Sequence, residues 1–64
     1  MMSSLVQVIL TRLSDGAEFE GMAWCDGGRY EAIWNEGGLR HVFHFREDGQ
    51  QIGTNKYRMR RADT

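Results

Sequence analysis

Glycine-containing pairs divide this chain into short segments of similar length. The four clusters are Asp15-Gly16, Gly27-Gly28, Gly37-Gly38 and Asp48-Gly49. Asp-Gly and Gly-Gly tolerate the positive φ angles that tight hairpin turns require. The segments between them have the usual length of β-strands, and the chain contains no proline. The sequence therefore predicts an antiparallel meander of five strands joined by tight turns.

Apolar and polar residues alternate within these segments, most regularly from Leu39 to Arg46. Such alternation is typical of a strand with two chemically different faces. Gly21 lies inside a predicted strand, where a bulge or a close backbone approach is the usual reason for glycine. Gly53 or the pair Thr54-Asn55 is expected to interrupt the last strand. The predicted strands are residues 5–13, 17–24, 29–35, 39–46 and 51–60.

The 64 residues are expected to form one small all-β domain, with residues 1–4 and 62–64 frayed. A five-stranded meander of this size either curls into a small SH3-like or OB-like barrel or stays a strongly twisted open sheet. Alternation places two apolar sets on opposite faces. One set is Phe19, Tyr30, Trp34, Phe43, Phe45 and Tyr57; the other is Met22, Trp24, Ile33 and Val42. A domain this small buries one set, so the other predicts a homodimer or a protein partner.

Charge is distributed unevenly along the chain, although the formal net charge is only −1. Residues 1–36 carry two basic and six acidic side chains, a net charge of −4. Residues 37–64 carry six basic and three acidic side chains, a net charge of +3. Such a molecule either meets a partner of mixed charge or pairs opposite charges across its own strands. The second interpretation is the simpler one.

The single cysteine, Cys25, permits no disulfide within one chain and fits a reducing compartment. The start of the chain lacks the charged and long apolar regions of a signal peptide. The longest apolar run is far shorter than the ~20 residues of a membrane helix. We therefore expect a soluble, cytoplasmic protein with no membrane partner.

The chain shows no recognisable catalytic, metal or cofactor motif. His41 and His44 are expected on opposite faces of one strand, with His41 among aromatic rings and His44 at the surface. Cys25 stands beside Asp26, which is not the electropositive setting that activates a thiol. The glycines match no phosphate-binding pattern. We expect no metal, no cofactor and no enzymatic activity.

Two segments resemble small phage and prophage proteins. These are Thr11-Arg12-Leu13-Ser14-Asp15-Gly16 and Phe45-Arg46-Glu47-Asp48-Gly49, which look like a Thr-Arg-Asp-Gly turn and an aromatic-Glu-Asp-Gly turn. The chain departs from that pattern in having Leu13 and Ser14 before Asp15. The resemblance implies a protein that binds and blocks a host protein or complex, for example a CRISPR component or another anti-phage defence component. It implies no functional residues.

Interface hot spots favour tryptophan, tyrosine and arginine, and the chain has seven arginines against one lysine. Our first hypothesis is therefore a non-catalytic interaction protein. The predicted partner-binding residues are Trp24, Trp34, Tyr57, Arg58 and Arg60.

Two other hypotheses remain open at the level of sequence. Small β-barrels bind single-stranded nucleic acid by combining aromatic rings with a basic groove. The residues that fit this pattern are Phe43, Phe45, Lys56, Tyr57, Arg58, Arg60 and Arg61. The near-neutral net charge argues against it, because such binders are usually basic. The third hypothesis is an oligomeric sponge that holds a signalling nucleotide between subunits.

Overall fold

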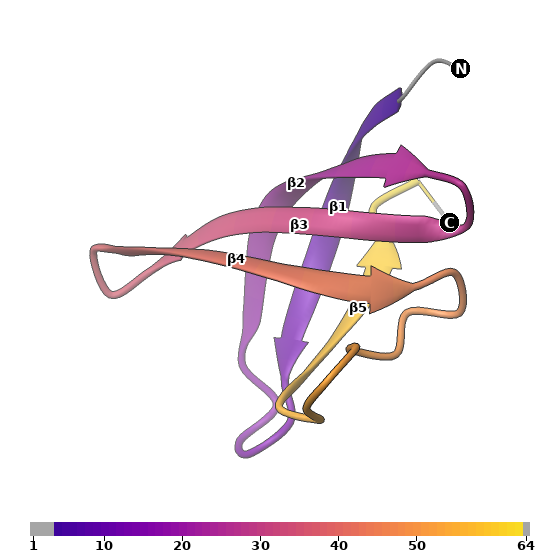
Figure 1. The fold of residues 1–64 in the computed structure, drawn as a ribbon. Helices are drawn as coiled ribbons and strands as arrows, with labels where there is room; N and C mark the ends of the chain where they lie inside the picture. Colours follow the sequence, from indigo (N-terminus) through magenta and orange to yellow (C-terminus); the bar gives the residue numbers. More distant parts are fainter. Residues whose placement is uncertain (1–3, 64) are drawn as a thin grey trace.

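The computed structural model describes residues 4–63. It contains five antiparallel strands in one strongly curled sheet, which confirms the predicted all-β class (Figure 1). The curl turns the sheet into a half-barrel: β3 and β4 run across the view, whereas β1 and β5 run steeply behind them. The strands are β1 (Ser4–Arg12), β2 (Glu18–Asp26), β3 (Arg29–Glu36), β4 (Leu39–Arg46) and β5 (Tyr57–Arg61).

The glycine clusters lie in the turns, as predicted. Seven of the eight glycines have a positive φ. A Cβ atom makes this conformation unfavourable, so these positions favour glycine. Gly27-Gly28 and Gly37-Gly38 each form a two-residue hairpin loop, flanked by the pairs Asp26↔Arg29 and Glu36↔Leu39. β2 consequently extends two residues further than predicted, through Cys25 and Asp26.

The strand order is β4-β3-β2-β1-β5. The first four strands form the predicted meander, but β5 returns to pair with β1, from Val8↔Arg61 to Arg12↔Tyr57. The predicted long strand over residues 51–60 is therefore wrong in extent. Gln50 and Gln51 form isolated bridges, and the chain turns at Gly53, with φ of 90°, before β5 begins. This interruption at Gly53 was one of the predicted alternatives.

Hydrogen bonds of the Gln51 side chain and of the backbone hold the connection between β4 and β5 against the half-barrel. The buried Gln51 side chain accepts the backbone N–H groups of Lys56 and Tyr57 through Oε1, both at 3.0 Å. The Met59 N–H donates to the Gly49 carbonyl at 3.0 Å. These bonds bring β5 to the far edge of β1 and partly close the half-barrel.

Residues 1–4 and 62–64 were predicted to be frayed, and two of the described ones take part in the sheet. Ser4 pairs with Cys25 at the start of β1, and the Ala62 N–H donates to the Gln7 carbonyl at 2.9 Å. The rest of that prediction falls partly on residues 1–3 and 64, which lie outside the described residues.

The core fills the inner face of the curled sheet. Val8, Leu10 and Phe45 are its largest fully buried side chains. Trp34 packs edge-on against Tyr57, with ring centroids 5.0 Å apart, and stacks on His41 at 5.4 Å. The inner face therefore contains the larger of the two predicted apolar sets. His41 lies among these rings and His44 is exposed, as expected.

Candidate interaction surface

The outer face of the sheet carries the second apolar set at the surface. Strand register aligns Met22, Ile33 and Val42 in one row across β2, β3 and β4. Leu5 of β1 pairs with Trp24 of β2 in the adjacent row. Most of these side chains are exposed, at 42% for Trp24, 48% for Leu5 and 44% for Val42, whereas Ile33 is half-buried. We call this group the outer apolar patch: Leu5, Met22, Trp24, Ile33 and Val42.

The patch stays exposed because this small sheet packs its core on the inner face only. A second layer on the outer face is absent from residues 4–63, since all five strands belong to one sheet. Contiguous apolar surface in a small protein usually marks an interaction site. The prediction that one apolar set remains exposed is confirmed, and the structure identifies which set it is.

Charged side chains lie on the same outer face as the patch. Arg58 and Arg60 project from β5, and Arg60 forms an ion pair with Glu18 at 3.6 Å. On the other side, Glu31 lies 3.5 Å from His44. Opposite charges from the acidic and basic parts of the chain thus meet across strands, as the simpler interpretation of the charge pattern expects.

Three of the predicted partner-binding residues are exposed and two are not. Trp24, Arg58 and Arg60 lie at the surface. Trp34 and Tyr57 are buried, with 3% and 7% exposure, and pack against each other in the core. In this structure these two rings therefore offer little accessible surface to a partner. Their alternation in the strand was interpreted correctly, but the sequence does not show towards which face the sheet curls.

The stacking surface of the nucleic-acid hypothesis is also largely absent. Phe45 and Tyr57 are buried, and Phe43 is half-buried beside Tyr57, so these rings are not displayed for bases. Lys56 is exposed, as are Arg58 and Arg60, whereas Arg61 forms an ion pair with Asp63 at 3.3 Å. Binding of single-stranded nucleic acid combines basic side chains with accessible aromatic rings, and the rings are not accessible here.

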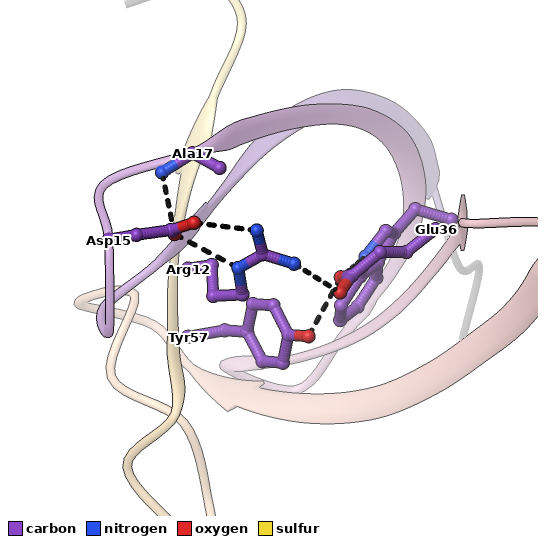
Figure 2. Close-up of polar contacts among 6 residues, drawn as sticks. Arg12, Asp15, Ala17, Glu36 and Tyr57 are labelled. Carbon is purple, nitrogen blue, oxygen red and sulfur yellow. Dashed lines mark hydrogen bonds and ion pairs between the residues drawn. The ribbon is translucent and has the colours of Figure 1, made fainter.

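A polar cluster at one end of the half-barrel joins β1, β3 and β5 (Figure 2). The Arg12 guanidinium donates to Asp15 through Nε at 2.9 Å and Nη2 at 2.7 Å, and to Glu36 through Nη1 at 2.7 Å. Glu36 also accepts the Tyr57 hydroxyl at 2.7 Å and the Trp34 indole N–H at 3.4 Å. The same guanidinium lies 5.3 Å from the centre of the Phe19 ring.

The hydrogen bonds of the cluster lower the pKa values of its two carboxyl groups and so favour their ionised forms. Hydrogen bonds from Arg12 lower the pKa of Asp15 from 3.8 to about 2. The hydrogen bond from Tyr57 lowers the pKa of Glu36 below 4.5. Burial, followed by the bond to Glu36, raises the pKa of the Tyr57 hydroxyl. Because every polar group is paired and the Trp34 and Tyr57 rings belong to the core, we assign this cluster to stability. Sequence reasoning missed it because its members come from distant strands.

We expect acid to weaken this cluster. Folded-state pKa values below the ordinary ones mean that the stabilisation is present above about pH 4.5 and is lost as the pH falls towards 2. The melting temperature of the wild type should decline as the pH is lowered between these two values. Glu36→Gln should lower the melting temperature at neutral pH and flatten the decline. Glu20→Gln, an exposed carboxylate outside the cluster, serves as the control; a decline unchanged by Glu36→Gln would contradict this assignment.

Within residues 4–63, no group of three or more His, Cys, Asp or Glu side chains is placed to hold a metal ion. The same residues contain no helix of the length and hydrophobicity needed to span a membrane. Comparisons with protein-family models, curated proteins and solved structures find no match to this chain.

Proposed function

We propose that this chain is a non-catalytic interaction protein that binds a larger protein through the outer apolar patch. The observation that carries the proposal is the exposure of Trp24 among four other apolar side chains on one sheet face. Interface hot spots are rich in tryptophan and arginine, and a hot-spot tryptophan becomes buried among apolar contacts when the partner binds. Arg58 and Arg60 supply exposed arginines on the same outer face, along β5.

The biological setting of the proposal comes from the turn residues that resemble those of phage and prophage proteins. In that setting the partner is a host protein or complex, such as an anti-phage defence component, and the bound chain blocks it by covering a functional surface. A small rigid sheet suits this mode of action, because binding orders few additional side chains.

The first test replaces one patch residue and one arginine of β5. Trp24→Ala and Arg58→Glu are each expected to weaken capture of the partner about tenfold or more, equivalent to ~1.4 kcal/mol or more. Both residues are exposed, so both variants should keep the wild-type melting temperature within a few degrees. Binding is measured with the immobilised protein and an extract of the cells that encode it, followed by titration of the retained protein.

Leu13→Ala is the matched control, because Leu13 is 41% exposed but lies in the β1–β2 turn, outside the patch. The control should bind like the wild type. Normal binding by both Trp24→Ala and Arg58→Glu would contradict the proposed location of the interface. Retention of nucleic acid in place of a protein would contradict the proposed function itself.

A further inference from the structure

β4 is an edge strand of the sheet, and only half of it is covered. The segment after β4 folds back over its second half: the Arg46 N–H donates to the Gln50 carbonyl at 2.8 Å, and the Ile52 N–H donates to the His44 carbonyl at 2.9 Å. Phe45 also bridges to Gln51. Within the described residues, no strand pairs with the outer edge of the first half, from Leu39 to Phe43. We call this segment the open edge.

Two residues of the open edge, Arg40 and Val42, direct their backbone N–H and C=O groups away from the sheet. In an antiparallel pair, successive residues direct their N–H and C=O groups alternately to one neighbour and the other. The backbone groups of His44 and Arg46 point away from β3, as their bonds to residues 50–52 show. The N–H and C=O groups of Arg40 and Val42 therefore point in the same direction, at an edge that no described strand covers. Figure 1 shows this end of the β3–β4 hairpin projecting beyond the other strands.

Apart from the charge of Arg40, the usual forms of edge protection are missing here. Proteins protect edge strands with charged side chains, lysine above all, or with proline, bulges or a covering segment. The open edge contains neither proline nor lysine, and its register with β3 is continuous from Glu36↔Leu39 to Ala32↔Phe43. Leu39 is 67% exposed, and Val42 belongs to the outer apolar patch. The open edge is thus a template for another strand, continuous with the surface proposed to bind a partner.

Charge identifies the kind of strand that fits. β4 contains Arg40, His41, His44 and Arg46 and no acidic residue. Among residues 4–63, the ion pairs involve the basic groups of Arg12, His44, Arg60 and Arg61, so Arg40 has no carboxylate partner. The other edge strand, β5, is also basic, with three arginines in five residues. A second copy would bring one basic edge against another, which like charges disfavour.

We propose that the open edge binds an extended acidic segment of the partner protein as an additional β-strand. This inference rests on the proposed function and names the chemistry of its partner. The backbone groups of Arg40 and Val42 pair with the added strand, which supplies affinity through main-chain hydrogen bonds. A carboxylate beside Arg40 and an apolar side chain beside Val42 supply specificity. The added strand thereby extends the outer apolar patch.

The test uses peptides of about seven residues, the length of a typical added strand. One peptide carries Glu and Val two positions apart, so that both lie on the face shared by Arg40 and Val42, and its counterpart has Lys in place of Glu. NMR titration of the full chain is expected to show at least tenfold tighter binding of the acidic peptide. Amide hydrogen exchange of Arg40 and Val42 should slow in the complex, whereas the His41 amide, which already faces β3, should change little.

A proline variant separates backbone pairing from charge. Arg40→Pro removes an N–H that faces away from β3, so the β3–β4 hydrogen bonds remain, as at other edge-strand prolines. It should bind the acidic peptide at least tenfold more weakly than Arg40→Ala, which lacks the charge but keeps the N–H. Arg40→Ala should in turn bind more weakly than the wild type. Unchanged melting temperature and β3–β4 amide signals confirm that the variants are folded.

Three outcomes would overturn the inference: equal affinity for the acidic and basic peptides, equal binding by Arg40→Pro and Arg40→Ala, or no slowing of exchange at Arg40 and Val42. Slowed exchange that depends on protein concentration without peptide would instead assign the open edge to a second copy. Failure of the proposed function is distinguishable, because Trp24→Ala would then leave partner capture unchanged while peptide binding at Arg40 persisted.

Discussion

Phe45→Ala is expected to lower the free energy of unfolding by about 3–5 kcal/mol, the usual cost of truncating a buried phenylalanine. Phe45 has no exposed surface and lies where β4 bridges to Gln51. Its ring also packs against Trp34, with centroids 6.3 Å apart. Removing it therefore opens a cavity at the point where the half-barrel partly closes.

The total stability of a 64-residue domain is roughly 3–10 kcal/mol, so this one substitution should unfold a large fraction of the molecules. Urea unfolding followed by circular dichroism measures the loss. Leu39→Ala is the control, because Leu39 is 67% exposed and its truncation should change stability by about 0.5 kcal/mol or less. A loss below ~1 kcal/mol for Phe45→Ala would show that the core is not where the structure places it.

Gly21→Ala is expected to destabilise the protein by about 1–3 kcal/mol, although alanine is ordinarily the better residue inside a strand. Gly21 is the one glycine without a positive φ, so its role is not conformational. A Cβ at this position would lie 2.7 Å from the Ile33 carbonyl oxygen and 2.9 Å from the Trp34 Cβ. Backbone atoms of β3 cannot give way without disturbing the β2–β3 pairing.

The sign of this effect makes the test decisive. Strand propensity alone predicts that alanine stabilises β2, whereas the close approach of β3 predicts the opposite. Chemical denaturation of Gly21→Ala distinguishes the two, with Glu20→Ala as the control at the adjacent exposed position. A variant more stable than the wild type would contradict the close packing of β2 against β3.

Much of the local structure was predictable from the sequence. Gly27-Gly28 and Gly37-Gly38 mark two-residue hairpins because few other residues adopt their positive φ, and a two-residue loop sets the register of the strands beside it. Register and alternation then place Met22, Ile33 and Val42 in one row. The exposure of such a row was predicted before the structure, and the structure confirms it.

The position of β5 was not predictable in the same way. The connection between β4 and β5 runs from residue 47 to residue 56, and its one tight turn pairs residues 50–52 with β4 without setting the register of β5. Its path depends on Gln51, whose side chain accepts backbone N–H groups five and six residues later. Nothing in the local pattern identifies this bond, so the pairing of β5 with β1 and the resulting open edge on β4 appear only in three dimensions.

The burial of Trp34 and Tyr57 was likewise not predictable from the local pattern. Alternation is symmetric: it separates two faces of a strand but does not say which one becomes the interior. The amino-acid sequence by itself determined the strands, the turns and the division into two apolar sets, because these depend on neighbours along the chain. Only the tertiary structure decided the direction of curl, the partner of β5 and the union of Arg12, Glu36 and Tyr57, because these depend on contacts between residues more than twenty positions apart.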